Sequence, residues 1–144
     1  MSAKPRDVFL QLINGVVDDR LDGLADLYAE ETDVRHPFAT PDRPPLLSRA
    51  DVREHFTFAD GLRPEFTRRV VDLVLHDGAD PEVVVAEFSY EFTYPDGKVF
   101  LMPAVMVMRV RDGKIVESHD YFDPIRGARA RGALPDLAAG LAVN

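Results

Sequence analysis

The chain has 144 residues, of which 46% are hydrophobic and 29% charged, with a formal net charge of -8 and no cysteine. This composition predicts one soluble domain over residues 1–144 with a hydrophobic core of its own. It excludes disulfides and thiol chemistry, and the acidic balance argues against nucleic acid as a partner. No signal peptide or membrane-spanning stretch is recognisable, so we expect a cytoplasmic protein that does not bind membranes.

The first half of the chain carries helical patterns. Apolar residues recur at helical spacing over Val8–Val17 and again over Leu21–Tyr28, which predicts two consecutive helices. VRHPF is expected to be extended, because a proline disfavours the α region for the preceding His36, and ATPDRPPLLS to form a loop. Ser48 with Asp51 three residues later is typical of a helix start and predicts a third helix over DVREHFTFAD.

The second half of the chain carries strand patterns. Four β-rich runs, TRRVVDLVLH, VVVAEFSYEFTY, KVFLMPAVMVMRV and KIVESHDYF, are separated by HDGADPE, PDG and RDG. An antiparallel meander after three helices is an α+β order. We therefore predict a curved, cone-shaped antiparallel sheet wrapped over three helices, with a pocket at its open end. Residues 125–144 are expected to be either a C-terminal tail or a lid.

One face of the last two strands is expected to line this pocket. If Arg111–Gly113 forms a three-residue loop, Val110 pairs with Lys114. Counting along both strands then places Asp120 opposite Ala104. The same face carries Met102, Met106, Ser118 and Phe122.

The PDG turn leaves two alternatives for the neighbouring strand, because one residue of register moves every side chain to the other face. A three-residue loop brings Tyr90 to the face of Asp120. A loop formed by Asp96 and Gly97 alone brings Glu87 there instead. Tyr90 and Glu87 are thus rival candidates for a second polar group in the pocket.

Asp120 is the first candidate for general acid or base catalysis. Burial of an aspartate raises its pKa towards the range in which proton transfer is efficient near neutral pH. The alternative is an exposed strand-end carboxylate, or one paired with Arg109. His36 is the second candidate, because imidazole titrates near physiological pH, although a loop histidine can also be satisfied by water or backbone.

The remaining candidates are apolar or weakly polar. Tyr28, on the expected second helix, either reaches the pocket or belongs to the core, and Phe56 on the third helix is expected to contact substrate. The four histidines show no metal-ligand spacing, so we expect no metal and no cofactor. The opposite face of the sheet is too apolar to remain exposed and predicts a homodimer, unless the C-terminal tail covers it. That face carries Leu101, Pro103, Val105 and Val107.

The order of elements, with YAEETDVRHPF near the front and RDGKIVESHDYFDP at the back, resembles the SnoaL-like branch of the nuclear transport factor 2 superfamily. Relatives in this superfamily include polyketide cyclases, ketosteroid isomerases and limonene epoxide hydrolases, which are cone-shaped α+β domains with a deep apolar pocket. The resemblance implies that Asp120 is similar to the pocket aspartate of the cyclases and epoxide hydrolases. His36 lies where ketosteroid isomerases place their catalytic aspartate.

The chain also departs from two of these relatives. Leu12 and Met106 stand where ketosteroid isomerases carry a tyrosine and a protonated aspartate. Glu87 and Ser89 stand where epoxide hydrolases carry an Arg-x-Asp pair. Both departures argue against those two activities.

Two functions therefore remain open. The first is a cofactor-independent cyclase, isomerase or hydrolase that acts on a small apolar ketone or polyketide-like compound, with Asp120 moving the proton and His36 or Tyr90 helping. The second is a non-catalytic module that binds a hydrophobic ligand in the same pocket or a protein partner on the sheet.

Overall fold

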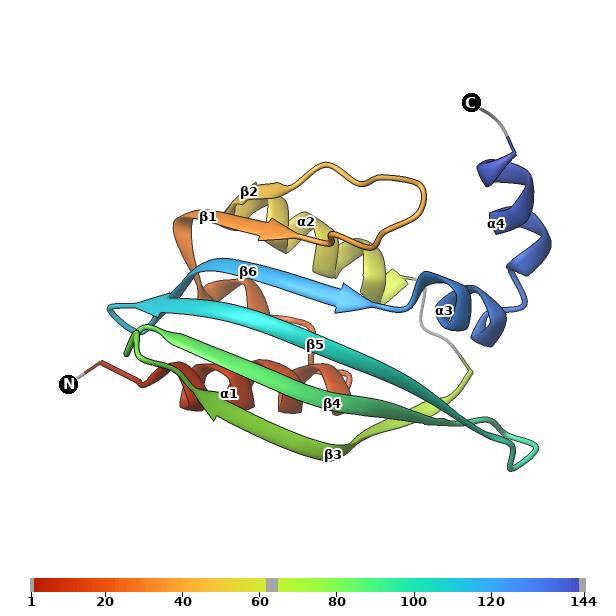
Figure 1. The fold of residues 1–144 in the computed structure, drawn as a ribbon, viewed down its shortest axis with the longest axis horizontal. Coiled ribbons are helices and arrows are strands. Elements are labelled where there is room, and N and C mark those ends of the chain that lie inside the picture. Colours follow the sequence, from red (N-terminus) through yellow and green to blue (C-terminus); the bar gives the residue numbers. More distant parts are fainter. Residues whose placement is uncertain (1, 62–64, 143–144) are drawn as a thin grey trace.

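A curved six-stranded sheet forms the framework of the fold, and two helices pack along its concave side (Figure 1). The structure, a computed structural model, describes residues 2–61 and 65–142. The strand order is β2-β1-β6-β5-β4-β3. In chain order the elements are α1 (Pro5–Val17), the 3-10 helix η1 (Leu24–Leu27), β1 (Tyr28–Arg35), β2 (Leu46–Ser48), α2 (Arg49–Gly61), β3 (Thr67–Asp77), β4 (Val83–Thr93), β5 (Val99–Arg111), β6 (Lys114–Phe122), α3 (Pro124–Ala130) and α4 (Leu134–Leu141).

The predicted α+β fold and its meander are confirmed. Strands β3, β4, β5 and β6 pair antiparallel in sequence order. Helix α1 packs against β3, β4 and β5, and α2 packs against η1, β1 and β2. The core therefore lies between the helices and the inner face of the sheet, where Phe9, Met108 and Ile115 are fully buried.

The sheet has two strands that the sequence patterns did not predict. Strand β1 pairs parallel with β6, and β2 pairs antiparallel with β1, so the sheet is mixed. The additional strands cover the backbone groups along the edge of β6, which would otherwise be left unpaired. They also extend the concave surface beyond the meander.

The predicted second helix is wrong over most of its length. Only Leu24–Leu27 form a short 3-10 helix, and Tyr28 begins β1. Gly23, with φ of 83°, interrupts the run before η1. The following stretch favours a strand because Thr32 and Val34 are β-branched and both point to the buried side.

The predicted start of the third helix is confirmed. The Ser48 hydroxyl accepts a hydrogen bond from the backbone N–H of Asp51 at 3.1 Å. The Asp51 carboxylate in turn accepts one from the backbone N–H of Leu47 at 3.0 Å. These reciprocal bonds satisfy backbone donors at the beginning of α2 and fix the direction in which the helix leaves β2.

The turn between β5 and β6 is shorter than predicted, and the register is different. Asp112 and Gly113, with φ of 52° and 75°, form a two-residue loop, and Arg111 pairs with Lys114. A bulge in β6 then shifts the register by a further residue, so that Asp120 lies opposite Met106 instead of Ala104. The two changes add to an even shift, and Asp120 therefore stays on the predicted face.

The turn between β4 and β5 follows the three-residue alternative. The backbone N–H of Tyr94 donates to the carbonyl of Lys98 at 2.9 Å, which closes the loop over PDG. Tyr90 consequently pairs with Met102 and points to the inner face. Glu87 lies on the outer face, where its carboxylate is 2.6 Å from Nε2 of His76, so the alternative that placed Glu87 in the pocket is wrong.

The C-terminal segment is helical as far as the structure describes it. Asp123 accepts hydrogen bonds from the backbone N–H groups of Ile125 and Arg126 and begins α3 directly after β6. Helix α4 follows after Gly132 (Figure 1). None of the helices within the described residues has the length and apolar character that crossing a bilayer requires.

Candidate active site

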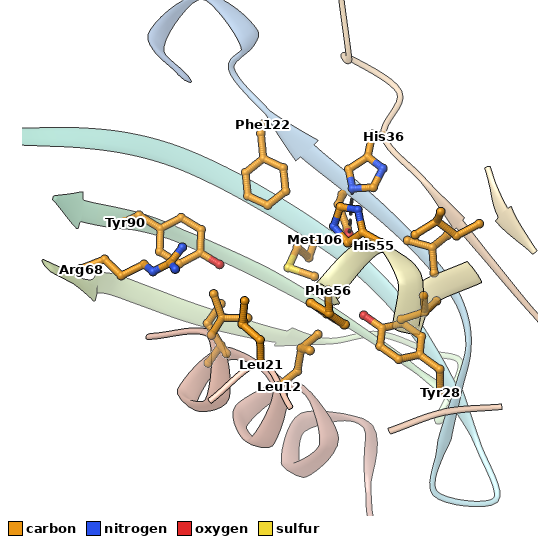
Figure 2. Close-up of a pocket in the computed structure, with 16 residues that line it drawn as sticks. Leu12, Leu21, Tyr28, His36, His55, Phe56, Arg68, Tyr90, Met106 and Phe122 are labelled. Atoms are coloured by element: carbon orange, nitrogen blue, oxygen red, sulfur yellow. Dashed lines mark ion pairs between the residues drawn. The ribbon is translucent and has the colours of Figure 1, made fainter. Parts of the chain in front are cut away.

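A cavity of about 240 Å³ lies between α1, α2 and the inner face of the sheet (Figure 2). Its walls are mostly apolar side chains from α1, the loop after it, β1, β2 and α2, together with two from the central strands. The apolar lining residues are Leu12, Ile13, Val16, Leu21, Val34, Leu46, Val52, Phe56, Met106 and Phe122. The polar ones are Tyr28, His36, His55, Arg68, Tyr90 and Asp120.

A wider cavity of about 730 Å³ continues from this one towards the surface. The two share His36, His55, Arg68, Tyr90, Asp120 and Phe122. The outer walls are the loop of residues 39–43 and parts of α3 and α4, including Leu137. The inner cavity thus opens through a vestibule whose rim carries charged residues of both signs. All polar residues of the inner cavity except Tyr28 lie at the junction of the two cavities.

Asp120 is buried at this junction, with 7% of its surface exposed. The Ser118 hydroxyl donates a hydrogen bond to Oδ1 of Asp120 at 2.5 Å. Burial raises the pKa of Asp120 to about 6, and the hydrogen bond from Ser118 opposes this rise by stabilising the carboxylate. The alternative pairing with Arg109 is wrong, because that guanidinium contacts Asp80 and Glu82 on the surface.

His36 lies beside Asp120, as the paired strands require. Arg35 at the end of β1 is in register with His119 of β6, so the next residues of the two parallel strands are neighbours. Nε2 of His36 is 3.8 Å from Oδ2 of Asp120, which is too long for a hydrogen bond. Burial, with the positive charge of Arg43 and the nearby His55, lowers the pKa of His36 to about 4. Near neutral pH the imidazole is therefore neutral, and the contact is not an ion pair.

Two tyrosines face the cavity from opposite sides. Figure 2 shows the hydroxyl groups of Tyr28 and Tyr90 pointing into the space between them. Burial raises the pKa of both phenols, and the charge of Asp120 raises each of them further. Both therefore remain protonated and available as hydrogen-bond donors. Tyr28 reaches this position from the start of β1 and not from a helix.

The other predicted binding residues fall into three groups. Phe56, Met106 and Phe122 line the inner cavity. Met102 lines only the outer one. Ala104 and Ser118 are buried on the same face without lining either cavity, and Ser118 acts on the site through its bond to Asp120.

The sequence analysis did not place His55 or Arg68 in the pocket. His55 shares one face of α2 with Val52 and Phe56, at i−3 and i+1, and this helical spacing was the pattern that indicated its position. Arg68 lies on the inner face of β3, opposite Phe92, and donates to Asp19 at 2.9 Å. Among residues 2–61 and 65–142, no three histidine or acidic side chains are grouped so as to hold a metal ion.

The curved α+β sheet with helices on its concave side has the nuclear transport factor 2-like fold, and a buried carboxylate lies at the mouth of its apolar cavity. The family model for the SnoaL-like domain matches residues 9–118, and the chain belongs to this family. The resemblance inferred from the sequence is thereby confirmed.

The similarities of this chain to individual proteins agree with its assignment to this family. The chain is 30% identical over 119 residues, which are 81% of this chain and 82% of the relative, to an uncharacterized PhzA/B-like protein of Pseudomonas aeruginosa. A phenazine biosynthesis-related protein from the same organism has a similar structure, with a TM-score of 0.70, 16% identity and coverage of 90% of this chain and 81% of that chain. A protein of ketosteroid isomerase-like fold from Catenulispora acidiphila, in complex with trimethylamine, has a TM-score of 0.69, 14% identity and coverage of 93% and 98%. At these identities the two structures show the fold alone.

Proposed function

We propose that this protein is a cofactor-independent enzyme of the cyclase or isomerase type that moves a proton on a small apolar ketone or polyketide-like substrate. Asp120 is the general acid and base. The observation that carries the proposal is a buried carboxylate, with its pKa raised to about 6, at an apolar cavity large enough for a small ligand.

The reaction begins when the ionised carboxylate of Asp120 takes a proton from the carbon next to the carbonyl group. The electron pair of that C–H bond becomes the new carbon–carbon double bond, and the carbonyl electrons move to oxygen. Neutral donors at the cavity, such as Tyr90 or His36, stabilise the oxygen. As the oxygen electrons re-form the carbonyl, the carbon–carbon double bond takes the proton back from Asp120, at the same carbon or, in a β,γ-unsaturated ketone, at the γ carbon. Because the base must be ionised, the rate is expected to rise with pH through about 6.

The direct test is proton exchange on a panel of apolar ketones in deuterated water, followed by NMR. We expect the protein to accelerate incorporation of deuterium next to the carbonyl. Leu46→Trp, which narrows the inner cavity, should abolish most of this acceleration. The matched control is Leu47→Trp, because the neighbouring Leu47 is 54% exposed and lines neither cavity.

A second candidate function is ligand binding without catalysis. It is favoured by Leu12 and Met106, apolar residues that line the cavity where ketosteroid isomerases carry their oxygen-binding pair. If ketones bind, as seen by chemical shift changes that Leu46→Trp abolishes, but none exchanges deuterium, the binding function holds and the catalytic one does not.

For the outer face of the sheet, we propose a second copy of the chain as the partner. Strand β5 presents an apolar row there, with Leu101 44% exposed and Val105 and Val107 half-exposed. An exposed row of this kind suits an isologous interface, in which the same patch of each subunit meets its copy.

Val105→Glu is expected to convert a dimer into a monomer, because it buries two like charges near the symmetry axis. Sedimentation velocity measures the change. Leu141→Glu on α4, a more exposed apolar position away from this face, should leave the dimer intact. A monomeric wild-type protein at micromolar concentration would contradict the proposal.

A further inference from the structure

Among the described residues, the hydrogen-bond partner of His55 is Arg43, whose chemistry fixes the protonation of the imidazole. Nη2 of Arg43, from the loop that forms the outer wall, lies 3.3 Å from Nδ1 of His55. A guanidinium group has five N–H donors and no acceptor. The contact therefore requires a lone pair on Nδ1, so His55 is neutral and carries its proton on Nε2.

The Nε2–H group of His55 is reachable from the cavity. In the described residues every fully buried side-chain nitrogen or oxygen has a hydrogen-bond partner. Within that same part of the chain Nδ1 of His55 bonds to Arg43, whereas Nε2 has no protein partner. His55 is only partly buried and lines both the inner and the outer cavity, so its ring is accessible from them. The protein thus presents a fixed donor to whatever occupies this space.

The donor lies in the same row of side chains as the proposed base. The ring centroids of His55 and His36 are 5.9 Å apart, and Nε2 of His36 is 3.8 Å from the Asp120 carboxylate (Figure 2). Phe56 packs edge-on against the His55 ring, with centroids 5.5 Å apart, which restricts its rotation. Burial and the charge of Arg43 lower the pKa of His55, which agrees with a neutral ring.

We propose that His55, oriented by Arg43, is the hydrogen-bond donor that binds the carbonyl oxygen of the substrate while Asp120 works on the neighbouring carbon. The inference rests on the proposed function and names the acceptor class, a ketone or enolate oxygen, that this part of the site recognises. When Asp120 takes the proton, negative charge develops on the oxygen, and the bond from Nε2–H strengthens with it. A neutral imidazole suits this task, because its N–H group donates a hydrogen bond to the oxygen and keeps its proton. Arg43 is a positioning residue.

The first test reads the tautomer and needs no substrate. In protein labelled with ¹⁵N at histidine, the Nδ1 resonance of His55 should have the shift of an unprotonated nitrogen and Nε2 that of a protonated one. Arg43→Ala should turn this single tautomer into a mixture, whereas Arg20→Ala, which removes a surface arginine paired with Asp18, should not. A predominant Nδ1–H tautomer in the wild-type protein would overturn the inference.

The second test uses 2-naphthol, a flat apolar phenol whose ionised form resembles an enolate. In the Asp120→Asn background, where no carboxylate repels the anion, its absorbance spectrum reports the affinity for the ionised form. Adding His55→Phe, which keeps a ring and loses the donor, should weaken this affinity roughly 10- to 100-fold. His55→Gln should restore part of it, and His76→Phe on the outer face should change nothing.

The two proposals can fail separately. If ketones exchange deuterium in an Asp120-dependent manner but His55→Phe leaves both kcat and naphtholate affinity unchanged, His55 is not the donor. If no ketone exchanges while the tautomer and the naphtholate affinity behave as expected, the donor is present and the proposed reaction is wrong. If both hold, His55→Phe should lower kcat much more than it raises KM.

Discussion

Asp120→Asn is expected to lower the rate of ketone proton exchange by about 100- to 10,000-fold, the usual contribution of a positioned general base. Asparagine has nearly the same shape and still accepts the hydrogen bond that Ser118 donates at 2.5 Å, so the cavity keeps its form. It cannot take a proton at neutral pH. NMR-detected deuterium incorporation measures the loss, and chemical shift titration with the same ketone should show an affinity within a few-fold of wild type.

Two controls separate this loss from a general disturbance. Asp77→Asn changes a surface carboxylate that pairs with Arg6 and should leave exchange unaffected. Ser118→Ala removes the bond that stabilises the carboxylate and should move the midpoint of the pH–rate profile to higher pH. Wild-type exchange in Asp120→Asn would show that another group is the base.

Asp120→Asn is also expected to stabilise the folded protein at neutral pH. The pKa of Asp120 rises from its ordinary value of 3.8 to about 6 on folding, so the folded state binds this proton more tightly than the unfolded state. The favourable contribution is complete below pH 4 and is lost as pH rises through 6. A pKa raised from 3.8 to about 6 corresponds to roughly 3 kcal/mol of stability, which Asp120→Asn should recover at pH 8 and hardly at all at pH 4. Urea unfolding at a series of pH values measures the difference.

His36 acts in the opposite direction and must be kept apart in this measurement. Its pKa falls to about 4 on folding, so the unfolded state binds this proton more tightly, and stability is lost as pH falls from about 6.5 to 4. The comparison of Asp120→Asn with wild type at each pH cancels this contribution to first order. Equal stability of the two proteins at every pH would mean that the carboxylate is solvated and would remove the basis of the proposed function.

The parts of the fold that the sequence predicted are those governed by local rules. The alternation of apolar residues and the turn residues at PDG and RDG define β4, β5 and β6, and the Ser48–Asp51 pair defines the start of α2. The parallel pairing of β1 with β6 was missed because it joins distant segments, and no local pattern specifies a partner at such separation.

Asp120 lies on the predicted face of the sheet for a reason that the register error makes clear. The loop and the bulge each displaced the pairing by one residue, so the side chain moved along the strand but stayed on its face. For Tyr90 and Glu87, one residue of register at the turn between β4 and β5 decided which side chain faces the cavity. The sequence alone left both alternatives open. His55 was missed although it shares a helical face with Val52 and Phe56. Arg68 was missed because no register was predicted for β3, so the face of its side chain was not assigned.

The parallel contact between β1 and β6 means that the buried carboxylate of Asp120 and its imidazole neighbour come from segments far apart in the sequence. Neither half of the chain contains both, so no partially synthesised or C-terminally shortened product that lacks β6 possesses the pair. The Asp120–His36 contact therefore forms only once β6 has paired with β1, and the Asp120 titration is a reporter of completed assembly.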